Sequence, residues 1–506
     1  MNITWLWRRG LYLSLWCVLA VPRGALAQDI DPVAAGIYEE AAALLEHLRR
    51  EEDLVGAGLG VLWPGMAPWD YGSGWAEREM DRAFSERTLN AQHELVQLFT
   101  AVAVLQLVEA NLVELDAPFT RYFPEFQPYA GTFPERFTVR QLLSHHGGLP
   151  AYYAPGSGRG AFNANGADEA WREVLAHDEE LALVAAPGEV FDYSYLGYDL
   201  LGLLIERQSG EAYADYIARH ILAPLNLSDT SFSADPASVP GIAQAYDDEE
   251  AVPHERLRDV PAAGLVSNVH DMGIFMQALL QGGQGILTVS SVEQLFQLQN
   301  ASLYDDNLGF GLGFFLTPLG DELLLASHSA FNDGASSYVV ALPRQGLGLV
   351  FTSNSEVNNV TLRAALDAFM ARMIEAHNAR PAPVYAPYPA AEADAQNLAL
   401  GAGVFSGPGG IYRVEQRRGG LRIEAPFLPS WLRVNLLPRA EDYYGVELRL
   451  WGLNLGWLSR LEPIAQGLEG RPQILDGRRL WHWRLQGAAV VTLTELVPAQ
   501  ENAALD

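Results

Sequence analysis

Residues 93–97 read HELVQ and differ by one residue from H-E-x-x-H, the helical motif of many zinc proteases. In that motif two histidines on one helix face bind the metal, and the glutamate acts as a general base. Here Gln97 replaces the second histidine, and an amide is a poor zinc ligand. His145, His146 and His328 are further imidazoles in the chain. The ligand chemistry nevertheless disfavours metal-dependent hydrolysis, and we expect neither a metal nor another cofactor.

The usual nucleophiles are missing around Glu94. No serine lies between Ser85 and Ser144, the only cysteine is Cys17, and the chain contains no lysine, because its 33 Lys+Arg residues are all arginine. A lysine base or a Schiff base is therefore excluded. The sequence also lacks G-x-S-x-G, the phosphate-binding G-x-x-x-x-G-K-[ST] and the glycine fingerprint of dinucleotide-binding folds.

The elements that must position these residues alternate between helices and strands. Apolar periodicity and stop signals predict helices over residues 38–52, 95–110, 138–145, 196–210 and 361–377, with Gly210 ending the fourth. The predicted strands cover 55–63 and 70–75, which form a hairpin, and 309–317, 336–344 and 347–354, which follow one another.

The composition changes after the last of these helices. Residues 379–397 are rich in Pro and Ala and are typical of a linker. Residues 398–506 contain short alternating segments between turns, which predict a small all-β domain. Its tryptophans, including Trp451, Trp457, Trp481 and Trp483, are expected to fill the β core. The domain organisation is then a signal peptide over 1–27, a main domain over 28–378, the linker, and the β domain.

The first 27 residues have the pattern of a secretory signal peptide. A basic start, a short apolar run and Ala25-Leu26-Ala27 precede Gln28. We expect cleavage after Ala27 and a periplasmic or secreted product without stable membrane insertion. The formal charge is −29, and loss of three arginines with this segment makes it −32. Nucleic acids and anionic membranes are poor partners for such an acidic surface.

Five segments in order resemble the serine β-lactamase and penicillin-binding-protein superfamily, in its class C-like and esterase-like branch. They are TLNAQHELVQLFTAVAVLQLVEANLVELD, FTVRQLLSHHGGLP, PGEVFDYSYLGYDLLGLLIERQSG, AAGLVSNVHDMGIFMQALLQGG and SHSAFNDGASSYVVALPRQGLGLVFTSN. The resemblance covers roughly residues 50–370. It implies a mixed α/β (α+β) fold with an antiparallel sheet and a helical subdomain, followed by a lipocalin-like β domain.

The superfamily transfers acyl groups through the serine of S-x-x-K, with the lysine and the tyrosine of Y-x-N managing the proton. A strand carrying K-T-G or H-x-G lines the pocket and supplies an oxyanion-hole amide. Position by position, the resemblance places Glu94 at the serine, Gln97 at the lysine, Tyr193-Ser194-Tyr195 at Y-x-N, and His328 and Ala330 at H-x-G. The nucleophile, the lysine, the asparagine and the glycine are thus replaced.

Two functions follow from these replacements. The favoured one is a catalytically inactive relative that binds a peptidoglycan-like, peptide or small-molecule partner. The alternative is a hydrolase of esterase or amidase type, in which Glu94 activates water with support from Tyr193 and His328. In the first case Glu94 is expected to hydrogen-bond Tyr193 or Gln97 and to fill the old pocket. Ser194 is expected to be a pocket-wall residue, because no activating base is visible near it.

Overall fold

The structure is a computed structural model, and it describes residues 31–495 with interruptions. The interruptions are residues 127–135, 151–171, 173–182, 184, 190, 248, 300–308, 320–322, 333, 358, 382–388, 393, 408–409, 418, 425–432, 451–452, 455–467, 476–477 and 486–487. The expected signal peptide, residues 1–27, lies outside the described residues. Within the described part, no helix is both long and apolar enough to cross a membrane.

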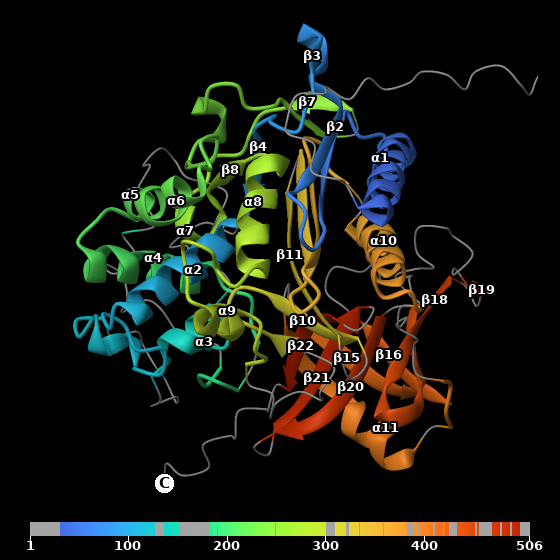
Figure 1. Cartoon of the computed structure of the whole chain (residues 1–506). Helices are drawn as coiled ribbons and strands as arrows, with labels where there is room; N and C mark the ends of the chain where they lie inside the picture. Colours follow the sequence, from blue (N-terminus) through green and yellow to red (C-terminus); the bar gives the residue numbers. More distant parts are fainter. Residues whose placement is uncertain are drawn as a thin grey trace, which may run out of the picture.

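An eight-stranded antiparallel sheet forms the centre of the first domain, in the order β3-β2-β1-β13-β12-β11-β10-β9 (Figure 1). Its strands are β1 (Gly56–Leu62), β2 (Trp69–Glu77), β3 (Arg82–Ala83), β9 (Gly309–Phe310), β10 (Phe315–Leu319), β11 (Leu323–Asn332), β12 (Ala335–Leu342) and β13 (Leu347–Ser353). The expected antiparallel sheet and the β1–β2 hairpin are confirmed. The expected run of three late strands was incomplete, because β11, which carries His328, lies between β10 and β12.

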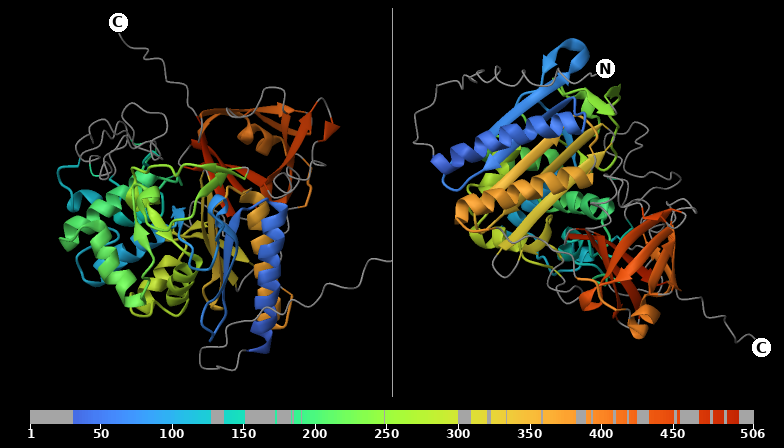
Figure 2. Two further views of the ribbon diagram at one scale, coloured as in Figure 1. Left: turned by 90° about the horizontal axis from the view of Figure 1, so that it is seen from above. Right: turned by 90° about the vertical axis from the view of Figure 1, so that its right-hand side faces the viewer.

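Helices cover both faces of this sheet. On one face α1 (Pro32–Glu51) and α10 (Asn359–Asn378) lie side by side, and on the other face α8 (Val269–Leu280) packs on β1 and β13 (Figures 1 and 2). Alternate residues of β1 face opposite sides of the sheet. Leu59 joins the core beneath α1 and α10, whereas a Cβ on Gly58 would lie 3.0 Å from Val269 Cγ1 of α8. The glycine therefore allows α8 to approach the strand closely.

The helical subdomain is built around α2 (Val96–Glu109), which is apolar on all sides and packs against other helices of the subdomain. A helix of this kind belongs in a core. The other helices on this side are α3 (Val139–Leu143), α4 (Tyr195–Ser209), α5 (Tyr213–Ile217), α6 (Ala223–Leu225), α7 (Val260–Ala263) and α9 (Val289–Leu295). Gly210 ends α4 in the left-handed conformation, with φ 74°, as the sequence predicts.

Short sheets connect the two parts. β4 (Asn90–His93) leads directly into α2 and pairs with β8 (Leu265–Ser267), which also pairs with β5 (Ser231–Phe232). A second small sheet contains β6 (Ala245–Asp247) and β7 (Glu250–Val252). Because β4 also contacts β11, β12 and β13, the start of α2 is held against the large sheet.

The C-terminal region is an all-β domain in which α11 (Ala395–Gly401) lies against a nine-stranded sheet, in the order β17-β16-β15-β14-β22-β21-β20-β18-β19, with an additional β17–β18 pairing. Its strands are β14 (Gly403–Gly407), β15 (Gly410–Arg417), β16 (Gly420–Glu424), β17 (Arg433–Pro438), β18 (Tyr444–Leu450), β19 (Leu453–Asn454), β20 (Leu468–Leu475), β21 (Arg478–Leu485) and β22 (Ala488–Glu495). The additional pairing curls the sheet, and the predicted small β domain is confirmed. Trp481 is fully buried in its core, while Trp451 and Trp457 lie outside the described residues.

Replacing Phe99 with alanine tests whether α2 anchors the subdomain. Phe99 is fully buried and stacks on Phe275 of α8 at 4.0 Å between ring centroids. The variant should lose about 3–5 kcal/mol of unfolding free energy, measured by denaturant titration, because the cavity cannot close fully. Val289→Ala is the control, since Val289 is 61% exposed and its loss should cost less than about 0.5 kcal/mol. Equal losses in the two variants would contradict this packing.

Candidate functional site

The resemblance places its reactive pair at the start of α2, and the structure puts Glu94 and Gln97 there. Glu94 lies in the turn between β4 and α2, and the backbone N–H of Gln97 donates to its carbonyl at 3.0 Å. Glu94 is 5% exposed and Gln97 is fully buried. A carboxylate just before a helix is stabilised by the positive end of the helix dipole. The local fold therefore suits a negative charge at Glu94.

Tyr195 hydrogen-bonds Glu94. Its hydroxyl donates to Oε1 of the Glu94 carboxylate, and both residues are buried. The two residues are 101 positions apart in the chain, and Tyr195 is the first residue of α4. The sequence led us to expect Tyr193 or Gln97 as the partner of Glu94. A tyrosine where the resemblance has asparagine reaches further, and this explains how Tyr195 comes to hydrogen-bond the carboxylate.

The side-chain amide of Gln97 is tied to two other segments. Its Nε2 donates to the carbonyl of Ala262 in α7 at 3.2 Å, and its Oε1 lies 3.2 Å from His145 Nε2. The backbone N–H of Ser194 donates to His145 Nδ1 at 3.0 Å. Nδ1 must therefore carry the lone pair, so Nε2 carries the hydrogen and donates to Gln97. The geometry thus fixes one neutral tautomer of His145.

Burial keeps His145 neutral. The ring is 2% exposed, and desolvation, followed by the nearby His328 and His146, holds its pKa well below the usual value. The superfamily has a lysine ammonium group at this position. This site has instead the neutral amide of Gln97, hydrogen-bonded to the neutral imidazole of His145.

Tyr193 and His328 form a second pair. The Tyr193 hydroxyl lies 3.0 Å from His328 Nε2, and His328 Nδ1 lies 2.7 Å from the carbonyl of Gly313. A carbonyl only accepts, so Nδ1 donates to Gly313 and Nε2 accepts from the tyrosine. Burial lowers the pKa of His328 to about 4. The hydroxyl of Tyr193 therefore donates its hydrogen bond to a neutral imidazole.

Ser194 has a structural hydrogen-bonding pattern. It caps α4, because its Oγ accepts from the backbone N–H of Gly197 at 3.1 Å, and its hydroxyl donates to the carbonyl of Pro150 at 2.8 Å. Ala330 is two residues from His328 in β11, is buried, and pairs with Ser337 of β12. The contacts of both residues are those of the scaffold, a helix cap for Ser194 and a strand pairing for Ala330.

Aromatic rings that the sequence reasoning missed surround the pair. Tyr193 stacks on His145 with ring centroids 4.2 Å apart and on Phe315 of β10 at 6.2 Å. Phe310 contacts both His145 and Phe315. The single strand expected over residues 309–317 is two short strands, β9 and β10, separated by residues 311–314. Nothing in the pattern GFGLGFFLT indicates which aromatic residue contacts His145.

Within the part of the chain that the structure describes, His93, the first residue of the HELVQ segment, does not have the surroundings of a metal ligand. It is buried, its backbone lies in the left-handed region at φ 42°, and burial lowers its pKa to about 4. Among the residues that the structure describes, no group of three or more His, Cys, Asp or Glu side chains could hold a metal ion.

Comparisons with known proteins agree with the fold. A sequence model of the β-lactamase family matches residues 41–369. Protein flp of Staphylococcus aureus (strain MW2) is 24% identical over 322 residues, which cover 62% of this chain and 63% of that protein. Esterase EstB of Burkholderia gladioli is 32% identical over 246 residues, which cover 46% of this chain and 62% of the esterase. The chain thus spans less than two thirds of the length of these curated relatives.

The crystal structure of SurE with D-Leu extends the similarity into the C-terminal region. It matches with a TM-score of 0.68 and 22% identity, covering 91% of this chain and all of SurE. At this identity the likeness concerns the fold. Because the family model matches more than half of the chain, with the sheet and the helical subdomain inside the matched residues, the protein belongs to the β-lactamase family.

Proposed function

We propose that this protein is a non-acylating member of the β-lactamase family, which acts by binding a ligand at the site that contains Glu94, Tyr193 and His328. The observation that carries the proposal is the buried carboxylate of Glu94, hydrogen-bonded by Tyr195 at the start of α2. Formation of an acyl-enzyme requires, at that position, a nucleophile whose acylated form is a stable ester. A carboxylate that attacked a carbonyl would instead form an anhydride, which is a poor resting intermediate.

The neighbouring groups also lack the means to move a proton for acyl transfer. Gln97 is an amide without basicity, and the chain has no lysine. Tyr193 donates its hydrogen bond to His328, and burial keeps that imidazole neutral. Loss of a nucleophile alone removes orders of magnitude in rate, and residues of one catalytic unit are not independent. Binding is therefore the function that these residues support.

The ligand class follows from the relatives and from the expected location. The SurE structure contains D-Leu, and EstB is named as an esterase. We therefore propose a ligand with a carbonyl or carboxyl group of peptide-like or peptidoglycan-like type, or a related small molecule. Export directed by residues 1–27 would place the pocket on the side of the membrane where cell-wall peptides occur.

One observation favours a second function, hydrolysis by water that Glu94 activates. The hydroxyl of Tyr195 donates to Glu94, and a hydrogen bond to a carboxylate favours its ionised form, which is the form that a general base requires. The same hydrogen bond occupies one carboxylate oxygen. We therefore keep this hydrolase as the alternative.

Covalent labelling tests the first proposal directly. Wild-type protein should form no adduct with a fluorescent penicillin or a fluorophosphonate, because an adduct on the carboxylate of Glu94 would not be stable. The double variant Glu94→Ser with Gln97→Lys restores the superfamily pair and should become labelled, read by in-gel fluorescence and intact mass. Tyr195, Ala330 and the N–H of His145, which would face the new ammonium group, should keep its labelling slow.

Each single variant is the matched control and should stay unlabelled, since serine and lysine act together. An adduct on the wild-type protein, mapped within the residues 90–97, would contradict the proposal.

The neutral state of His328 predicts a pH dependence of stability. Its folded pKa of about 4 lies below the ordinary value of 6.5, so between these values the unfolded chain binds more protons. Stability is then complete above pH 6.5 and falls as the pH drops toward 4, by up to about 3 kcal/mol from this residue. Denaturant titrations at several pH values should show a weaker decline in His328→Gln.

His93 and His145 contribute in the same direction, so the decline should shrink in the variant without vanishing. Identical pH profiles for wild type and His328→Gln, or an imidazole NMR titration of His328 near pH 6.5, would show that the ring is not held neutral.

A further inference from the structure

Two aspartates meet inside the helical subdomain. Asp199 lies in α4, one helical turn after Tyr195, and Asp259 is the residue before α7. Asp199 is 2% exposed and Asp259 is fully buried, and their carboxyl groups hydrogen-bond each other. Two ionised carboxylates in such contact repel each other and have no proton to share. One member of the pair must therefore be protonated.

Arg258 decides which aspartate keeps the negative charge. Its Nε and Nη2 donate to the two carboxylate oxygens of Asp259, the second at 2.9 Å, and such a fork suits an ionised carboxylate. Among the described residues no hydrogen-bond partner reaches the buried Oδ1 of Asp199. Burial, and next the charge of Asp259, hold the pKa of Asp199 well above its ordinary value. Asp199 therefore carries the proton and donates it to Asp259.

The other helices packed on α4 are α2, α3 and α5. α5 presents Tyr213, a phenol whose pKa burial raises, with a smaller contribution from Asp199. Residues 96–108 of α2 carry no charged side chain, and α3 carries Arg140, which pairs with an aspartate of a neighbouring loop. Within the described part of the chain, the charges that act on Asp199 thus come from the segment before α7.

The aspartate pair connects the helices that hold the candidate site. The carbonyl of Asp259 accepts from the backbone N–H of Ala262 at 3.0 Å in the first turn of α7, and the carbonyl of Ala262 accepts from Gln97. On the other side of the pair, α4 carries Tyr195, which hydrogen-bonds Glu94. Because α2, α4 and α7 pack on one another (Figure 1), a movement between α4 and α7 would change the surroundings of both site residues.

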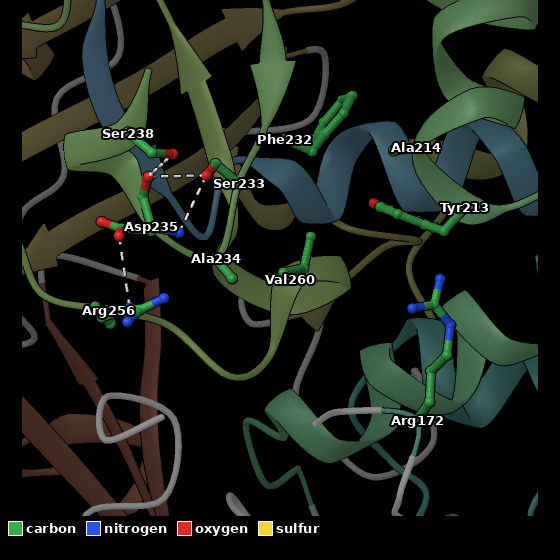
Figure 3. Close-up of a pocket in the computed structure, with 10 residues that line it drawn as sticks. All are labelled: Arg172, Tyr213, Ala214, Phe232, Ser233, Ala234, Asp235, Ser238, Arg256 and Val260. Carbon is green, nitrogen blue, oxygen red and sulfur yellow. Dashed lines mark hydrogen bonds and ion pairs between the residues drawn. The ribbon is translucent and has the colours of Figure 1, made fainter. Parts of the chain in front are cut away.

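Water can come close to the pair. Tyr213 and Val260 line a cavity of about 340 Å³ (Figure 3), and Val260 directly follows Asp259 in the chain. A space of this volume with polar groups in its walls can hold water. A local opening between α4 and α7 would therefore bring the shared proton into contact with solvent.

We propose that the proton shared by Asp199 and Asp259 locks α4 against α7, and that this lock weakens as the pH rises. In the closed arrangement Asp199 keeps the proton, whereas in contact with water its carboxyl group loses the proton above the ordinary pKa of 3.8. Opening therefore releases a proton to water, and an equilibrium that releases a proton shifts toward its products as the pH rises. The lock sets the arrangement around Glu94 and Gln97, whether that site binds or hydrolyses its ligand.

Hydrogen exchange of the full chain, followed by mass spectrometry over a range of pH, tests this lock. The variant Asp199→Asn keeps the size of the side chain and an N–H donor for Asp259, but it has no proton to lose. In peptides that cover residues 94–97 and 260–264, the ratio of wild-type to variant exchange should rise about tenfold per pH unit from about pH 5, because opening releases one proton. The ratio should level off at the pKa of Asp199 in the closed form. Comparison at equal pH cancels the base catalysis of exchange and the titration of the buried histidines.

Asp116→Asn is the matched control, because Asp116 is an exposed aspartate that pairs with Arg140, and it should follow the wild type. Infrared spectra at neutral pH give a second measurement, in which Asp199→Asn should lose carboxylic-acid absorption that Asp116→Asn keeps. If Asp199→Asn fails to fold, Asp199→Ser, which is also neutral and able to donate, takes its place.

Three results would overturn the proposal. One is an exchange ratio that stays constant with pH, and another is carboxylic-acid absorption that the neutral variants leave intact. The third is an equal rise of the ratio in residues 433–438 of the C-terminal domain, which would show unfolding of the whole chain instead of a local lock.

Discussion

The arrangement of the site depends on the hydrogen bonds of the Gln97 side-chain amide. It joins α2 to α7 through the carbonyl of Ala262, and to α4 through His145 and the backbone of Ser194. All of these groups are buried, and a buried polar group without a partner costs about 1–3 kcal/mol. Three segments distant in sequence must therefore meet in one arrangement to complete the hydrogen bonds.

This network also explains why the site accepts an amide at position 97. Ser194 donates to one nitrogen of His145, so the single proton of the neutral ring must lie on the other and point at Gln97. A lysine ammonium has only donors and would face that N–H group. The amide oxygen accepts it, and the amide nitrogen still satisfies Ala262. The polar groups around Gln97 are thus matched to one another.

Thr100, one helical turn further along α2, makes similar contacts. Its hydroxyl lies 2.7 Å from that of Tyr213 and 3.0 Å from the carbonyl of Pro261 in α7. Tyr213 and Val260, the first residue of α7, both line the cavity of about 340 Å³. The contacts of α2 with α7 therefore support the residues around Glu94 at one turn and this cavity near the next.

Much of the fold could be predicted from the sequence, because it depends on local signals. The glycine that ends α4 and the alternating residues of β1 are examples. β11 was not predicted as a strand. Its polar residues Ser327, His328 and Ser329 do not show the apolar pattern of a buried strand, and their burial comes from tertiary packing. The hydrogen bond from Tyr195 to Glu94 was not predicted, because the resemblance has the shorter asparagine at that position and only the packing of α4 against α2 shows how far the tyrosine reaches. The tautomers of His145 and His328 likewise depend on backbone groups whose direction has no sequence signal.

We propose that Glu94 occupies the position of the nucleophile without performing its chemistry. Steady-state hydrolysis of a chromogenic ester and a chromogenic cephalosporin by wild type and by Glu94→Gln tests this proposal. We expect that neither protein releases product above the rate in buffer, and that the substitution changes nothing. Wild-type turnover that disappears in Glu94→Gln would contradict it and would establish the glutamate as a general base.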